Sequence, residues 1–207
     1  MIEIVKPMDI EKRSFEIITE LLGDRRLDPE TEPVVKRVIH TTADFDYADS
    51  LHFSEHAVRR GVEALRAGCD IVTDTQMARS GINKTILSRL GGQVHCFMSD
   101  ADVAEEARER GVTRAIVSME RAANLKKPCI FAIGNAPTAL LALRELVDAG
   151  RVSPALIVGV PVGFVNVVES KETIIASGAP CIVARGRKGG SNVAAAICNA
   201  MLYQIMR

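Results

Sequence analysis

The sequence predicts an α/β protein with a doubly wound, mostly parallel, five-stranded sheet that is preceded by two N-terminal helices. Short runs that are apolar throughout alternate with amphipathic stretches, which is the pattern of parallel strands covered by helices on both faces. Right-handed crossovers are then expected between the strands. The predicted strands are Asp70–Thr73, Val94–Met98, Ile130–Ile133, Leu156–Val160 and Ile182–Ala184.

The N-terminal part predicts helices with clear start and stop signals. The first opens at Asp9, places Ser14 among the apolar residues of one stripe, and closes at Gly23. The second is predicted to begin at Asp28, with a proline in its first turn, and to end at His40. A third helix, capped by Ser54, is expected to run to position 68.

Length and composition favour one domain, residues 1–207, because 207 residues with 47% hydrophobic content can bury one core. The 26 basic and 26 acidic residues cancel, so no nucleic-acid or anionic-membrane partner is expected. No apolar run is long enough to span a bilayer. The five cysteines form no CxxC pair. We expect buried structural thiols in a reducing cytoplasm, with no secretory leader.

The loops that follow the predicted strands are rich in small residues, amides and hydroxyls. In an open parallel sheet these loops meet outside the carboxyl ends of the strands. Four of them lead into helices, whose first N–H groups lack partners and suit anions. The segment Arg185–Asn192 is the most pronounced, with three glycines, Arg187 and Lys188. We interpret it as a carboxylate or phosphate site, while an ordinary glycine turn with solvated basic side chains is the alternative.

Several common reaction types lack support. Neither GxxxxGK[ST] nor GxGxxG occurs, which argues against a nucleotide cofactor. No GxSxG elbow is present, so a serine nucleophile is not expected. Cys96 is adjacent to His95, but neighbouring side chains of a strand point to opposite faces, so this imidazole cannot readily activate that thiol.

Among the four histidines, His40 is the candidate acid/base group. Its expected position at a helix C-terminus favours the imidazolium, and the hydroxyls of Thr41 and Thr42 follow it. The alternative is a histidine that only caps backbone carbonyls. His52 and His56 are not expected to share a face, so no metal site is predicted, and His95 is interpreted as structural.

Long segments of the chain resemble the precorrin-8X methylmutases, enzymes of corrin (vitamin B12) synthesis that move a methyl group within ring C. The phrases GNAPTAL at 134–140 and GVPVGFV at 159–165, followed by ESK at 169–171, carry much of the resemblance. The matching segments together are Lys12–Phe15, Arg37–Ala48, Thr73–Lys84, Phe131–Leu140, Gly159–Lys171 and Arg185–Ser191.

The resemblance implies a Rossmann-like sheet in a homodimer without a bound cofactor, with His40 as the catalytic histidine. Ser14 is similar to a substrate-contacting serine of the family, and Arg114 to an arginine near the substrate; after Arg114 the residues 115–119 depart from the family pattern, and no role is extended to them. The expected substrate contacts are Ser14, Thr75, Gln76, Arg79, Ser80, Gly81, Arg114, Asn135, Thr138, Gly163, Phe164, Lys188, Gly189, Gly190 and Ser191.

The implied reaction is an intramolecular methyl shift in precorrin-8 or cobalt-precorrin-8, giving hydrogenobyrinate or cobyrinate, with possible handover of the product to the next enzyme of the pathway. Residues 40–48, HTTADFDYA, are more similar to the anaerobic, cobalt-containing branch, but the sequence leaves the presence of cobalt open. A corrinoid carrier without activity is the alternative. A nucleotide-dependent oxidoreductase is disfavoured by the missing glycine fingerprint.

Overall fold

The computed structural model describes residues 5–206 and contains one six-stranded sheet in the order β1-β6-β5-β4-β2-β3. Five strands run parallel, and β1 pairs with β6 in the antiparallel direction. Residues 1–4 and 207, the two ends of the predicted domain, lie outside the described residues. The strands are β1 Leu51–Phe53, β2 Asp70–Thr73, β3 Val94–His95, β4 Cys129–Ile133, β5 Leu156–Gly159 and β6 Cys181–Ala184.

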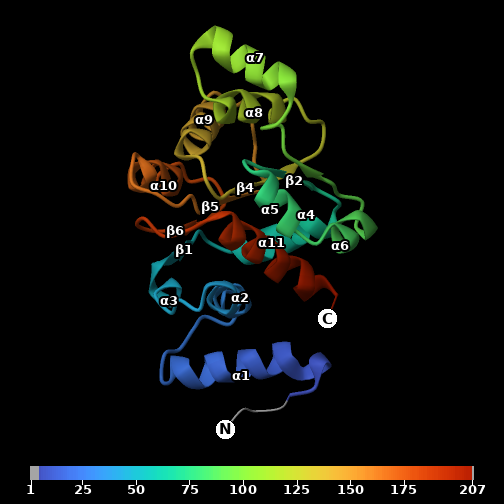
Figure 1. Ribbon diagram of the computed structural model, residues 1–207, viewed down its shortest axis with the longest axis vertical. Coiled ribbons are helices and arrows are strands. Elements are labelled where there is room, and N and C mark those ends of the chain that lie inside the picture. The colour runs from blue at the N-terminus through green and yellow to red at the C-terminus, as the bar shows by residue number, and fades with distance from the viewer. Residues whose placement is uncertain (1–4, 207) are drawn as a thin grey trace.

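Helices cover both faces of the sheet, as predicted. Helices α8, α9 and α10 lie on one face and α4 and α11 on the other, while α2 packs outside α11 and α1 outside α2 (Figure 1). The helices are η1 Pro7–Asp9, α1 Ile10–Leu22, α2 Glu32–Thr42, α3 Tyr47–Ser50, α4 Ala57–Arg66, α5 Gln76–Gly81, α6 Lys84–Arg89, α7 Ala101–Arg110, α8 Arg114–Ala122, α9 Pro137–Asp148, α10 Val167–Ile175 and α11 Ser191–Ile205.

The central strands are apolar because both of their faces are covered. Every residue of β2, β4, β5 and β6 is buried. Alternate residues of β4 enter the two halves of the core, with Ile130 on the side of α11 and Phe131 on the side of α9. Helix α11 is apolar around much of its circumference, since it is enclosed between the sheet and α2. Burial on both faces explains why runs that are apolar throughout could locate the central strands.

The prediction of five strands missed β1. Its three residues, Leu-His-Phe, carry little periodic signal and follow a polar loop. The strand exists because β6 offers a free edge, on which Leu51 pairs with Ala184 and Phe53 with Ile182.

Two predicted helix starts were wrong, because in each case the capping group makes a different bond. The second helix begins at Glu32, and the carboxylate of Asp28 instead accepts the N–H of Glu30 in a preceding turn. The third begins at Ala57. The hydroxyl of Ser54 accepts the N–H of Cys181 at 2.8 Å and so extends the pairing of β1 with β6.

All five cysteines are free and buried, which confirms their prediction as core thiols. Burial raises the pKa of the Cys69 thiol to about 12 and that of Cys129 to about 11. Within residues 5–206, no helix is long and apolar enough to cross a membrane.

Candidate active site at the carboxyl edge of the sheet

Asp74, directly after β2, connects the loop after β2 with the loop after β4. Its side chain is 1% exposed and accepts three backbone N–H groups from the loop after β4, those of Gly134, Asn135 and Ala136, at 2.9, 2.8 and 2.6 Å. Burial raises the pKa of this carboxyl, while the three N–H bonds act in the opposite direction. The carboxylate fixes the loop that opens α9.

The same edge brings β2 to the start of α11. The hydroxyls of Thr75 and Ser191 are 2.7 Å apart, and Thr75 also accepts the N–H of Ala78 as the cap of α5. Gly134 lies against this junction, where a Cβ atom would be 2.7 Å from the Cα of Ser191. The strand-end loops therefore converge, as the sequence predicted.

The expected donors of the loop after β4 are nevertheless occupied. The N–H groups of residues 134–136 all point to Asp74, so an internal carboxylate takes the place of the ligand anion that the sequence suggested. The Asn135 side chain stays exposed. For this loop, the side chains and not the backbone are left to contact a ligand.

The loop after β6, Arg185–Gly190, is tied to the end of α2. The ammonium of Lys188 lies 2.6 Å from carboxylate oxygens of both Asp44 and Asp46. Hydrogen bonding to Asp44, then to Asp46, raises the pKa of Lys188, and the same ammonium lowers the pKa of Asp44. This pair of contacts brings the segment after His40 to the loop after β6.

Arg187, in the loop after β6, contacts Phe164, in the loop after β5. The Arg187 guanidinium donates to the Phe164 carbonyl at 3.1 Å and lies 5.7 Å from its ring centroid. Gly163 donates its N–H to the carbonyl of Arg187, which joins the loops after β5 and β6. The Phe164 ring remains 82% exposed and can offer an apolar surface to a ligand.

His40 lies in the last turn of α2, as predicted, and is exposed. Its ring stacks on Phe15 of α1, with centroids 5.3 Å apart and planes at 8°. Ser14, which precedes Phe15, donates its hydroxyl to the carbonyl of Ile10 at 2.9 Å. Thr41 and Thr42 donate their hydroxyls to helix carbonyls, so neither is a partner of the imidazole. In the described part of the chain the ring has no hydrogen-bond partner, which counts against a purely capping role.

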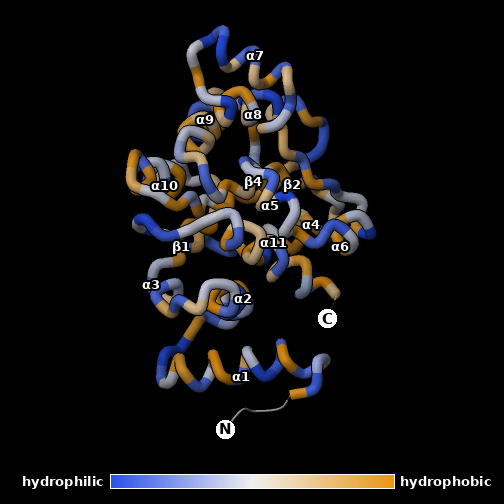
Figure 2. Tube along the Cα trace, in the orientation of Figure 1, coloured by the Kyte–Doolittle hydropathy of each residue, from blue (hydrophilic) through white to orange (hydrophobic). Residues whose placement is uncertain are grey.

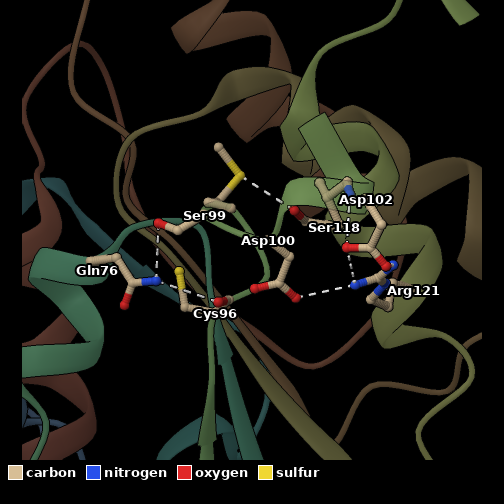
Figure 3. Close-up of polar contacts among 9 residues, drawn as sticks. Gln76, Cys96, Ser99, Asp100, Asp102, Ser118 and Arg121 are labelled. Atoms are coloured by element: carbon tan, nitrogen blue, oxygen red, sulfur yellow. Dashed lines mark hydrogen bonds and ion pairs between the residues drawn. The ribbon is translucent and has the colours of Figure 1, made fainter. Parts of the chain in front are cut away.

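Helix α5 carries four predicted contact residues. The Gln76 amide points toward the hydroxyl of Ser99 and the carbonyl of Cys96 in the loop after β3 (Figure 3). Arg79 is exposed and reaches the carbonyl of Val94, and the Ser80 carbonyl accepts from Lys84. Gly81 packs closely on α11, since its Cβ would lie 2.9 Å from that of Ala195.

Arg114 is the first residue of α8 and is exposed. The preceding Thr113 donates its hydroxyl to that of Thr138 at 3.0 Å, so the starts of α8 and α9 lie together. Arg121, farther along α8, is instead held by Asp100 and Asp102 (Figure 3). The structure thus places Arg114, and not Arg121, among groups that are free for a ligand.

Two functional groups escaped the sequence interpretation. Asp74 stands directly after a buried strand, which was a usable signal. Lys171 stands within the ESK phrase of α10 and is completely buried, with its ammonium 2.8 Å from the carbonyls of Gly186 and Lys188. The histidines and acidic residues form no metal site in the described chain. Within residues 5–206, no group of three or more His, Cys, Asp or Glu side chains could hold a metal ion.

His95 hydrogen-bonds Asp70 at 2.9 Å, in keeping with its structural interpretation.

Comparison with known proteins decides the family. The model of the precorrin-8X methylmutase family matches residues 9–204. The chain belongs to this family. As a member, it is a methylmutase, an isomerase.

Curated relatives match over nearly their full length. The cobalt-precorrin-8 methylmutase of Salmonella typhimurium is 48% identical, over 98% of this chain and 97% of its own. The precorrin-8X methylmutase of Pseudomonas aeruginosa is 40% identical, over 93% of each chain. A crystal structure of the enzyme from Thermus thermophilus superposes with a TM-score of 0.88 at 38% identity, covering 96% of this chain and 98% of that one.

Proposed function

We propose that this methylmutase converts cobalt-precorrin-8 to cobyrinate by moving one methyl group within ring C. The shift is intramolecular: the bond from the methyl carbon to one ring carbon breaks as its bond to another forms, so neither S-adenosylmethionine nor a redox partner is required. The choice of the cobalt-containing substrate rests on the most similar of these relatives: three cobalt-precorrin-8 methylmutases are 46–48% identical and three more are 38–39% identical, while two precorrin-8X enzymes are 40% and 34% identical.

His40 is the proposed acid. Its imidazole stacks flat on Phe15 and has no hydrogen-bond partner within residues 5–206. It lies four residues before Asp44, to which Lys188 of the loop after β6 is bound. This is the observation that carries the proposal. Protonated His40 donates a hydrogen bond to a pyrrole-derived ring nitrogen, which favours the tautomer whose migration gives the conjugated corrin. Such a charged hydrogen bond contributes on the order of 1.5–3 kcal/mol.

The remaining acceleration comes from binding the macrocycle in a shape near the transition state. The proposed contacts lie at the carboxyl edge, on α1 and at the end of α2, and the exposed basic groups Arg79, Arg114 and Arg187 suit its acetate and propionate groups. In this respect the fold is used in the Rossmann-like manner, with the ligand outside the carboxyl ends of the strands.

Replacement of His40 tests the acid/base role. We expect His40→Ala to lower kcat by about 10²–10⁴, the range typical of a positioned acid or base, with the affinity for cobyrinate nearly unchanged. His56→Asn is the control, because His56 is also exposed, its ring pairs with Glu30 and Glu55, and asparagine tolerates the positive φ of this position. Turnover is followed by absorbance, and NMR locates the methyl group in the product.

Near-normal methyl migration in His40→Ala would remove the mechanism. A wild-type protein that binds the corrinoid tightly but never moves its methyl would instead be the carrier. Parallel assays with metal-free and cobalt-loaded substrate decide whether cobalt is required.

We further propose a cytoplasmic homodimer that can pass its product to the next enzyme. The dimer is supported by an exposed apolar stripe on the outermost helix α1 and the segment before it: Met8, Ile10, Ile17 and Leu21. The cytoplasmic location is supported by the five free thiols. Product handover is supported only by the implied place of the enzyme in a pathway.

A further inference from the structure

Lys171 is a buried charge without a buried counter-charge. Its side chain is 0% exposed, and its ammonium donates to two carbonyls of the loop after β6, at 2.8 Å each. No carboxylate within the described residues forms an ion pair with it. Desolvation lowers its pKa to about 8, so the cation is retained at neutral pH only at a cost. We therefore ask what the buried ammonium does for the loop after β6, whose carbonyls it binds.

The two carbonyls fix the direction of two peptide planes. The described chain has no cis peptide, and in a trans peptide the C=O and the N–H point to opposite sides. Because the carbonyls of Gly186 and Lys188 point inward to Lys171, the N–H groups of the next residues, Arg187 and Gly189, point away from it. Neither N–H has an acceptor among residues 5–206.

The other peptide groups of the loop form hydrogen bonds with the loop after β5. The Arg187 carbonyl accepts the N–H of Gly163, and the N–H of Gly190 donates to Val160 at 2.8 Å. Gly189 is packed so closely that a Cβ atom would lie 2.1 Å from the Val160 carbonyl oxygen. The loop is therefore a fixed platform, and its two free N–H groups are preorganised.

We propose that Lys171 is a positioning residue, which turns the N–H groups of Arg187 and Gly189 outward to bind carboxylates of the substrate. The inference rests on the proposed function, which supplies a polyacid ligand. Backbone N–H groups without an internal acceptor can bind anions, and the buried cation behind them adds a favourable field. Lys171 itself never touches the substrate.

Substitution of Lys171 by Met tests the proposal, since Met is apolar and of similar length. We expect the Kd for cobyrinate to rise at least about tenfold, the equivalent of one charge-assisted hydrogen bond, with kcat changed less than about threefold. Lys126→Met is the control, because Lys126 is exposed and lies just before β4, at the other end of the strands. Thermal unfolding establishes that each variant is folded.

A ligand without carboxylates separates this role of Lys171 from a general loss of structure. For cobyrinate whose carboxylates are converted to primary amides, we expect Lys171→Met and the wild type to bind within about twofold of each other. An equal loss of affinity for acid and amide would overturn the carboxylate assignment. Unchanged affinity of folded Lys171→Met for the acid would overturn it as well.

A second pair of variants leaves Lys171 intact. Arg187→Ala removes the guanidinium and keeps the N–H, whereas Arg187→Pro removes both. Proline removes no internal hydrogen bond here, because the N–H of Arg187 has no acceptor among residues 5–206, and Arg187 has no positive φ. We expect cobyrinate to bind Arg187→Pro about tenfold more weakly than Arg187→Ala, again one charge-assisted bond. Equal affinities would contradict the proposal, even if Lys171→Met fails to fold.

The wild type distinguishes this inference from the proposed function. If the wild type neither binds cobyrinate nor moves the methyl group, the proposed function fails. If it does both, and the variants behave as their controls, only the role of Lys171 fails.

Discussion

At the scale of single residues, Asp74 and Lys171 perform complementary tasks. Asp74 is an internal acceptor that gathers three N–H groups of the loop after β4. Lys171 is an internal donor that gathers two carbonyls of the loop after β6. Each charged side chain forms hydrogen bonds that water or a ligand would otherwise form, so that the buried backbone groups stay paired. One loop thereby loses its free donors, and the other presents them.

Replacement of Asp74 by Asn measures this role. An amide has only one acceptor oxygen, and its NH₂ group faces the donors of residues 134–136, so we expect the free energy of unfolding to fall by about 1.5–3 kcal/mol. Urea unfolding at pH 7 measures the change. Asp148→Asn is the control, because Asp148 pairs only with Arg144 on the surface of α9, where such pairs contribute about 0.3–0.5 kcal/mol. Equal losses in both variants would contradict the role of Asp74.

At the scale of elements, the loop after β6 couples the sheet to α2. Lys188 bonds Asp44 and Asp46 directly after α2, while the next residues of the loop open α11, on which α2 packs. The position of His40 relative to the sheet is therefore set by one ion-pair cluster and one helix interface. The side chain of Lys188 is 48% exposed, so solvent screens the pair and its main effect is on geometry.

Titration of Asp44 tests this coupling. The neighbouring ammonium lowers the pKa of Asp44 below its ordinary 3.8, and Lys188→Met should move it back toward that value. Because the folded pKa is the lower one, the pair stabilises the fold above pH 3.8 and loses its effect as the pH falls through the folded value. NMR detection of the Asp44 carboxyl measures the shift, with Lys126→Met as the control. An unchanged pKa in Lys188→Met would show that the contact is absent in solution.

At the scale of the whole molecule, α1 is the outermost layer and is separated from the sheet by α2 and α11 (Figures 1 and 2). It buries Ile18 and Leu22 against the core, while Leu21 stays 65% exposed on another face. The helix also supplies Phe15, on which His40 stacks. The same helix therefore carries both the ring that stacks on His40 and, on another face, the exposed apolar stripe proposed for the dimer.

Charges on the α1 stripe test the dimer. We expect the wild type to sediment at twice the 22.4 kDa chain mass, and the double variant Ile17→Lys, Leu21→Lys to sediment as a monomer, because buried unpaired charges disfavour an apolar interface. Glu16→Lys, which changes charge on α1 outside the stripe, should remain dimeric. A double variant that stays dimeric would place the interface elsewhere.

The sequence by itself determined the five parallel strands, the helices on both faces, the buried thiols and the position of His40 in the last turn of a helix. These follow from local patterns, because a strand covered on both faces must be apolar along its length and a helix end needs its own cap. The strand-end loops were also predictable as a group, since the carboxyl ends of parallel strands meet at one edge.

Only the tertiary structure decided which loop groups are free. Whether the N–H groups of residues 134–136 face a ligand depends on Asp74, sixty residues earlier, and the direction of the peptides after β6 depends on Lys171 from a different helix. The β1 strand likewise forms only because β6 leaves an edge open. Hydrogen-bond partners that are distant in sequence leave no periodic trace, because a donor or acceptor can be satisfied by any group that the fold brings within reach.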